Sequence, residues 1–462
     1  MALAHQDAAS PVDTGDALDH LIAEQEAQLI ARTPRSHELH EEASAYLPGG
    51  VASSWQDAPP CPVFLERGAG SHVWDVDGNE YVDLHGGFGT MIAGHAHPAV
   101  VAAVNDRVAA GTHFAQPVPD IIAVARELAR RFELPLWRFT NSGTESTMAA
   151  VHLMRAVTGR PDIIKVEGSY HGHHDALQVS VYPDLDEAGP PDRPRSVPEH
   201  GAVPAAVAAH THVVPFGQLA AVRRVLLAHP GRIAGMIIEP VMMNIGVVPP
   251  PPGYLDGLAT LLHTHGALLT FDEVKTGLTI APGGAIERFG VVPDIVCLAK
   301  ALGSGVPCGA IGGTAEVMCA IADGTYEQVG TFNGNPLTMA VAKAVLLEVL
   351  TPAAYAHLDE LCSELVARAH HTLGRHRLAG YVSAYGAKGA VVFSPVRIRD
   401  YRDFTRYDAR YGHAHWLHQH NGGVFLPPWG KMEQWTVSVQ HTADDIDRAA
   451  GNLERFAAAL QT

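Results

Sequence analysis

The stretch FDEV at 271–274, followed by PDIVCLAKALGSG at 293–305, decides the fold of this chain. In each, an apolar run ends on a charged residue, Asp272 in the first and Lys300 in the second. Short apolar runs of this kind are typical of strands buried on both faces of a parallel sheet. Because ligands bind at the carboxyl ends of such strands, the two stretches predict a site that contains Asp272 and Lys300.

Similar runs occur on both sides of this stretch. Between about residues 93 and 335, helical segments alternate with strand-like segments: DIIKV (162–166), IAGMIIE (233–239), ALLTFDEV (267–274), DIVCLAK (294–300) and GAIGG (309–313). The alternation predicts an α/β fold, with a mostly parallel central sheet flanked by helices on both faces. A two-stranded hairpin is expected at 71–84, around an Asp-Gly turn.

The C-terminal region has a different pattern and predicts a second, smaller domain. A long helix at 335–350 leads to three strand-like segments, AVVF, VFLPP and WTVSVQ, and to a closing helix from about residue 443. This mixture is typical of an α+β domain. We therefore predict an N-terminal arm with part of the small domain at 1–75, a large domain at 76–337 and a C-terminal small domain at 338–462.

Composition excludes several classes of function. The net charge of −17, from 32 basic and 49 acidic residues, argues against nucleic-acid and anionic-membrane partners. The five cysteines are scattered and never spaced C-x-x-C, so no disulfide framework or zinc site is expected. The HGHHD run at 171–175 lacks metal-ligand spacing, and no metal is predicted. Without an apolar leader or membrane-length run, the chain is expected in the cytoplasm.

Lys300 and Asp272 carry the chemistry that we predict. A lysine directly after a buried strand has a lowered pKa, which makes it a nucleophile toward an aldehyde. Lys275 is its nearest competitor, but it lies in a Thr-Gly turn, where a solvated charge is expected. A carboxylate buried at Asp272 needs a cation, and a protonated pyridine nitrogen would supply one. An ordinary salt bridge or helix cap at Asp272 is the alternative.

FTNSGTEST (139–147) places two hydroxyls and free backbone N–H groups where a helix is expected to begin. Such a helix start binds phosphate, although a plain helix cap would use the same residues. A phosphate, a pyridine nitrogen and an aldehyde are together the features of pyridoxal 5′-phosphate (PLP), which we expect as the cofactor. GGFGTMIAG (86–94) lacks the spacing of a dinucleotide-binding fingerprint, so that cofactor class is disfavoured.

Eight motifs in order resemble the class III aminotransferases of PLP fold type I, in the branch that contains glutamate-1-semialdehyde 2,1-aminomutase. The resemblance runs from about residue 47 to 447. The motifs are PGGV (48–51), MIAGHAHP (91–98), NSGTE (141–145), YHG (170–172), EPVMMNIGVVPP (239–250), FDEV, PDIVCLAK and GTFNGNP (330–336).

The resemblance assigns roles around the cofactor ring. It implies that Lys300 forms the Schiff base and that Asp272 holds the pyridine nitrogen. Tyr170 would stack on one ring face and Val274 would pack against the other. Asn244 would lie near the 3-hydroxyl edge.

The resemblance also assigns the phosphate site and the assembly. Ser142, Gly143 and Thr144 would bind the phosphate within one chain. Thr331 would reach the phosphate of the neighbouring subunit, which implies a homodimer with composite active sites. Glu239 would support the structure and take no part in catalysis.

The chain departs from the aminomutase pattern where the substrate is expected. In that pattern, PGGV leads to an arginine that holds the substrate carboxylate, whereas this chain continues with Trp55 and Gln56. We expect both to contact the substrate. Lys275 also replaces the methionine usual in FDEVMTG. Three cations of the small domain are candidates to replace the arginine: Arg397, Arg399 and Lys431.

These features favour a transaminase that moves an amino group from an amine or amino acid to a keto acceptor by ping-pong chemistry, on a substrate with a substantial apolar part. Lys300 would act as the general acid and base. The first alternative is glutamate-1-semialdehyde 2,1-aminomutase itself. Further alternatives are a PLP-dependent racemase or epimerase and a catalytically silent binding protein of the same fold.

Overall fold

The computed structural model describes residues 15–427 and 435–461. Its largest sheet has the strand order β4-β10-β9-β8-β7-β5-β6. All neighbouring pairs from β9 to β6 are parallel, and β10 is antiparallel to both of its neighbours. The predicted mostly parallel sheet is therefore confirmed. The strands are β4 (Leu136–Thr140), β5 (Asp162–Val166), β6 (Thr211–Val214), β7 (Ile233–Ile238), β8 (Leu268–Asp272), β9 (Ile295–Leu298) and β10 (Gly309–Gly313).

The five strand-like segments of the sequence all form strands of this sheet, because continuous burial selects continuous apolar runs. Every residue of β5, β7, β9 and β10 is buried. Strands β4 and β6 were not among the strand-like segments predicted from the sequence. In β4, LWRFT exposes alternate residues and carries an arginine, and β6 is only the four residues THVV. Neither has the pattern of a strand buried on both faces.

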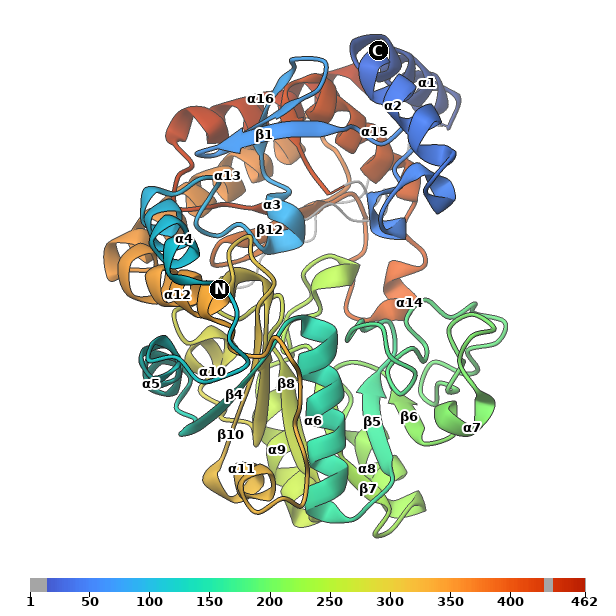
Figure 1. The fold of residues 1–462 in the computed structure, drawn as a ribbon. Helices are drawn as coiled ribbons and strands as arrows, with labels where there is room; N and C mark the ends of the chain where they lie inside the picture. Colours follow the sequence, from blue (N-terminus) through green and yellow to red (C-terminus); the bar gives the residue numbers. More distant parts are fainter. Residues whose placement is uncertain (1–14, 428–434, 462) are drawn as a thin grey trace.

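Helices cover both faces of this sheet, and α6 crosses its front in Figure 1. A serine cap starts α6, since the Ser142 side chain accepts from the backbone N–H of Glu145 at 3.2 Å. The elements of this region are α4 (Pro98–Ala110), α5 (Asp120–Phe132), α6 (Gly143–Thr158), α7 (Ala205–Ala208), α8 (Leu219–Ala228), η3 (Met243–Ile245), α9 (Tyr254–Thr264), α10 (Gly284–Phe289), η4 (Lys300–Leu302), α11 (Ala315–Ala322) and α12 (Pro336–Ala344).

The N-terminal region lies beside the C-terminal one, as Figure 1 shows for α1 and α15. The predicted hairpin forms β2 and β3, and β3 pairs in parallel with β13 from the far end of the chain. These strands complete a sheet of order β1-β2-β3-β13. The N-terminal elements are α1 (Gly15–Arg32), α2 (Pro34–Ser44), η1 (Pro48–Gly50), η2 (Ser54–Gln56), β1 (Leu65–Ala69), β2 (His72–Asp75), β3 (Glu80–Asp83) and α3 (Gly86–Gly89).

The C-terminal region mixes helices with a small antiparallel sheet of order β11-β12-β14, in agreement with the α+β pattern of the sequence. A buried ion pair joins it to the large sheet: the Arg402 guanidinium donates to both oxygens of Glu167, just after β5, at 2.7 and 2.8 Å. The elements are η5 (Val345–Val349), α13 (Pro352–Arg375), β11 (Tyr381–Tyr385), β12 (Lys388–Val392), α14 (Tyr401–Phe404), α15 (Ala409–Asn421), β13 (Val424–Phe425), β14 (Trp435–Thr436) and α16 (Ala443–Ala459).

Among the described residues, no single helix has the length and apolar character to cross a membrane. One pair, Pro336–Val349 with Pro352–Arg375, reaches that length and apolar character only together, and it bends by 75° at the break.

Candidate active site

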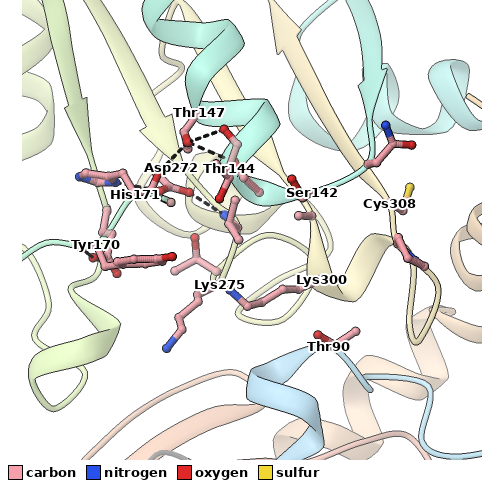
Figure 2. Close-up of a pocket in the computed structure, with 18 of the residues that line it drawn as sticks. Thr90, Ser142, Thr144, Thr147, Tyr170, His171, Asp272, Lys275, Lys300 and Cys308 are labelled. Carbon is pink, nitrogen blue, oxygen red and sulfur yellow. Dashed lines mark hydrogen bonds and ion pairs between the residues drawn. The ribbon is translucent and has the colours of Figure 1, made fainter. Parts of the chain in front are cut away.

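A cavity of about 340 Å³ lies where the carboxyl ends of β8 and β9 meet the start of α6. It brings together nine of the eleven residues that the sequence predicts for the site. Figure 2 shows Lys300, Lys275 and Tyr170 on one side of this cavity, below Asp272 and the first turn of α6. The nine residues are Trp55, Ser142, Gly143, Thr144, Tyr170, Asn244, Asp272, Val274 and Lys300.

The start of α6 forms an anion-binding corner of the cavity. The first N–H groups of a helix have no partner within it, and the helix dipole adds partial positive charge there. The Thr144 hydroxyl is held by the backbone N–H of His173, which donates to it at 3.0 Å. The acid of this turn points away, because Glu145 Oε2 accepts from the backbone N–H of Asn141 at 2.8 Å. The corner is thus suited to a phosphate.

Asp272 is oriented by a histidine that the sequence analysis missed. The carboxylate is 5% exposed, and its Oδ2 lies 2.8 Å from Nδ1 of the buried His171. Its Oδ1 accepts from the backbone N–H of Val274 at 3.0 Å. Within the described part of the chain, His171 Nε2 has no hydrogen-bond partner. The sequence feature that could have identified His171 is the histidine run at 171–175, which was considered only as a possible metal site.

Lys300 begins η4 directly after β9, and burial lowers its pKa. Its backbone has φ +45°, a strained conformation for a residue other than glycine. Strain of this kind is frequent at functional sites. The environment is therefore the one that the sequence predicts for a nucleophilic amine.

The prediction that Lys275 is a solvated charge in a turn is wrong. It lines the same cavity, and its Nζ donates to Asn244 Oδ1 at 2.6 Å. Burial, and after it the charge of Lys300, lower its pKa to about 7. The reason is tertiary: residues 276–280, which follow it, are all buried, so the turn faces the protein interior.

Two aromatic rings and one valine form the apolar walls of the cavity. The rings of Trp55 and Tyr170 have centroids 4.9 Å apart. The backbone of Tyr170 is held by Glu239, whose Oε1 accepts its N–H at 3.2 Å. Val274 packs so closely against Gly143 that a Cβ at this glycine would lie 2.9 Å from Val274 Cγ1. The glycine at the start of α6 is therefore required by packing.

Two predicted site residues lie outside the cavity. Gln56 is exposed, and its Oε1 accepts from the backbone N–H of Ala52 at 3.2 Å, so its amide is turned into its own loop. Thr331 is exposed and lines a different cavity, together with His113 and Phe139. Within one chain Thr331 therefore does not line the cavity of Lys300.

Two of the three cations proposed to replace the missing arginine, Arg397 and Arg399, do not line the cavity. Arg397 is exposed and lies over the ring of Tyr381, at 5.3 Å from its centroid. Arg399 is exposed and pairs with Asp403 at 3.0 Å. Lys431 lies outside the described residues.

One group of described residues has its potential metal-ligand atoms within 4.8 Å of one another: Asp162, His212 and His229. It lies at the start of β5, at the sheet edge opposite the cavity. Arg232 already donates to the Asp162 carboxylate at 2.9 Å, and His210 lies 2.7 Å from it. The group is thus separate from the candidate active site.

Comparisons with known proteins match most of the chain. The family model described as class-III aminotransferase matches residues 53–455. A glutamate-1-semialdehyde 2,1-aminomutase of Brevibacillus brevis is 37% identical over 421 residues, covering 90% of this chain and 96% of that protein. An omega-transaminase of Sphaerobacter thermophilus has 32% identity and a TM-score of 0.85, over 92% of this chain and 97% of that one.

A third relative was solved with a ligand. It is a glutamate-1-semialdehyde aminomutase of Pseudomonas aeruginosa, with a lysine-to-alanine substitution, in complex with PMP. It is 28% identical, with a TM-score of 0.89 over 96% of this chain and 99% of that one. The likeness of this chain to its relatives therefore extends over both the large sheet and the C-terminal region.

Proposed function

The chain belongs to the class-III aminotransferase family and depends on pyridoxal 5′-phosphate, and from this premise we propose that it transfers amino groups between separate molecules. The observation that carries the proposal is the cavity itself: its amine, its carboxylate and its helix start suit the cofactor, and the rings of Trp55 and Tyr170 form an apolar part of its wall. The substrates are a small amine or amino acid and a keto acceptor.

The residues of the cavity fit the cofactor. Ser142, Gly143 and Thr144 at the start of α6 would bind its phosphate. Asp272 would hold the proton on the pyridine nitrogen, and Lys300 would bond to the aldehyde carbon. The bound cofactor supplies an electron sink for carbanion chemistry. Lys300 Nζ, whose pKa burial lowers, can then take the proton from the substrate carbon that bears the amino group and return it.

Gln56 and Trp55 favour a substrate with an apolar part. A neutral glutamine cannot make the charge-assisted pair of an arginine with a carboxylate, which contributes about 1.5–3 kcal/mol, or roughly 10- to 150-fold in binding. The ring of Trp55 instead adds apolar surface beside Tyr170. The small intermediate of the aminomutase reaction, which has one carboxylate and no aryl group, gains little from such a surface, whereas an aryl-bearing amine gains apolar contact.

Glutamate-1-semialdehyde 2,1-aminomutase is the second candidate, and a specific observation favours it. The relatives with 37–38% identity are named as this aminomutase, so by name they support it more than they support an intermolecular transaminase. Trp55 and Gln56, at the place of the family's carboxylate-binding arginine, favour the intermolecular transaminase instead. A homodimer with Thr331 shared between sites, and a cytoplasmic location, stay predictions.

The test follows the absorbance of the bound cofactor. The holoenzyme is mixed with aryl amines, α-amino acids, β-amino acids or glutamate-1-semialdehyde, and its conversion from the aldehyde to the amine form is recorded. Pyruvate or 2-oxoglutarate should then restore the aldehyde form. Lys300→Ala should lose both the conversion and the lysine adduct that borohydride traps, whereas Lys275→Ala should keep the adduct.

The expected result is conversion by amines or amino acids with an apolar part. Efficient turnover of the semialdehyde alone would overturn the proposal and favour the aminomutase. Loss of optical activity without a keto product would indicate a racemase. A trapped adduct on Lys275 would move the nucleophile to that residue.

A further inference from the structure

Lys388, at the start of β12, is a buried amine that has no anion beside it among the described residues. The residue is 1% exposed, and within residues 15–427 and 435–461 its Nζ donates only to Thr436 Oγ1, at 3.1 Å. The group also lies against the backbone of α3, because a Cβ placed on Gly89 would be 1.8 Å from Lys388 Nζ. Burial without an anion is costly for a charged group, so the charged form of Lys388 would need an anionic partner.

The side chain of Lys388 lines a small cavity of about 40 Å³ that adjoins the candidate active site. Lys275 lines both cavities, as do Trp55 and Tyr170. A water molecule requires about 10–15 Å³ of such space, so the small cavity has room for a carboxylate. It therefore extends the active site, and two lysines, Lys275 and Lys388, line this extension.

The electrostatics at this place favour an anion. Burial lowers the pKa of Lys388 well below its ordinary value, and the charges of Lys275 and Lys300 add to this effect. His85, which also lines the small cavity, is kept neutral near pH 7 because burial lowers its pKa to about 4. An anion between the two lysines would relieve their mutual repulsion and favour their charged forms.

A structural role alone does not account for Lys388, as a second buried lysine shows. Lys165 in β5 is also fully buried, but its Nζ donates to two backbone carbonyls, those of Ser169 at 3.0 Å and Val179 at 2.6 Å. Lys165 is thus satisfied by the fold. Lys388 has one hydroxyl partner among the described residues and faces open space.

We propose that Lys388 and Lys275 bind the carboxylate of the substrate, whose apolar part lies against Trp55 and Phe88. The rings of these two aromatic residues have centroids 5.3 Å apart, and both line the small cavity. The inference deepens the proposed function and rests on it: the amino donor is an acid with an aryl or similarly apolar group. The two lysines take the place of the arginine that Gln56 does not supply.

The first arm of the test measures binding to the holoenzyme by calorimetry, without turnover. The probes are 3-phenylpropanoate and its neutral amide, 3-phenylpropanamide. Wild type should bind the acid more tightly than the amide. Lys388→Met and Lys275→Met should each weaken the acid roughly 10- to 150-fold and leave the amide unchanged, since each removes a hydrogen bond between charged groups. Lys343→Met, at an exposed lysine paired with Asp120, is the matched control.

The second arm compares two amino donors, 3-amino-3-phenylpropanoate and 1-phenylethylamine, by cofactor absorbance. Lys388→Met should lower the second-order rate constant for cofactor conversion by the acid roughly 10- to 150-fold. The rate constant for conversion by the amine should stay unchanged. Equal binding of acid and amide to wild type, or wild-type affinity for the acid in both variants, would overturn the subsite. If no amine or amino acid converts the cofactor, the proposed function is overturned. The binding measurements would still show whether Lys388 and Lys275 bind the carboxylate.

Discussion

The contact between His171 and Asp272 predicts how much of the cofactor affinity depends on one histidine. His171 is fully buried, and its Nδ1 lies 2.8 Å from Asp272 Oδ2. Nδ1 therefore donates to the carboxylate that we expect to face the pyridine nitrogen. His171→Ala removes this donor and leaves a cavity beside Asp272. Among the described residues, the backbone N–H of Val274, at 3.0 Å, is the donor that the carboxylate keeps.

The magnitude follows from the loss of one hydrogen bond to a charged group, about 1.5–3 kcal/mol. If this energy holds Asp272 in the orientation that the ring nitrogen needs, the cofactor binds roughly 10- to 150-fold more weakly in His171→Ala. His171→Asn should recover most of the affinity, because an asparagine Nδ2 can take the place of histidine Nδ1. Loss of Nε2 should matter little, since in the described structure that atom has no partner.

The assay is a titration of apoenzyme with cofactor, followed by absorbance, in four proteins: wild type, His171→Ala, Asp272→Asn and the double variant. If the histidine acts through Asp272, the double variant should be no weaker than Asp272→Asn alone. Thermal unfolding of each apoenzyme separates a general loss of stability from the loss of affinity.

Two results would refute this reasoning. One is an affinity of His171→Ala equal to that of wild type, which would mean that Val274 and the strand alone orient Asp272. The other is full additivity of the two substitutions, which would place His171 and Asp272 in independent roles. A His171→Asn variant as weak as His171→Ala would show that shape, rather than the donor, is what the site needs.

Three further perturbations follow from the same structure. Arg402→Met leaves the buried Glu167 carboxylate unpaired and should lower the free energy of unfolding by about 3–5 kcal/mol in urea titrations; adding Glu167→Gln should recover most of it, and no recovery would contradict a charge effect. Gly143→Ala forces Val274 to move, and the overpacking should weaken cofactor binding by about 1–3 kcal/mol. A cofactor titration that gives wild-type affinity would contradict this prediction. We expect a homodimer by sedimentation in which Thr331→Val weakens cofactor binding about 10-fold or more without dissociating the dimer; a fully active monomer would exclude the composite site.

The local pattern of the sequence was sufficient to predict which central residues line one cavity. Buried strands end on Asp272 and Lys300, and NSGTE starts a helix, so strand alternation and capping chemistry place these groups at one edge of one sheet. Each of these signals is contained in fewer than ten consecutive residues. The same locality explains why the fold class could be predicted, together with the five buried strands of the large sheet.

What surrounds those groups was decided by tertiary structure. His171 and Asp272 are 101 positions apart, and Lys388 reaches the active site from a different sheet. Lys275 is in a turn whose direction depends on the burial of the residues after it, and Gln56 is turned away by a contact within its loop. A sequence pattern records whether a side chain is compatible with burial. Which partner or cavity that side chain meets depends on how distant segments pack, because packing of the whole chain sets those distances.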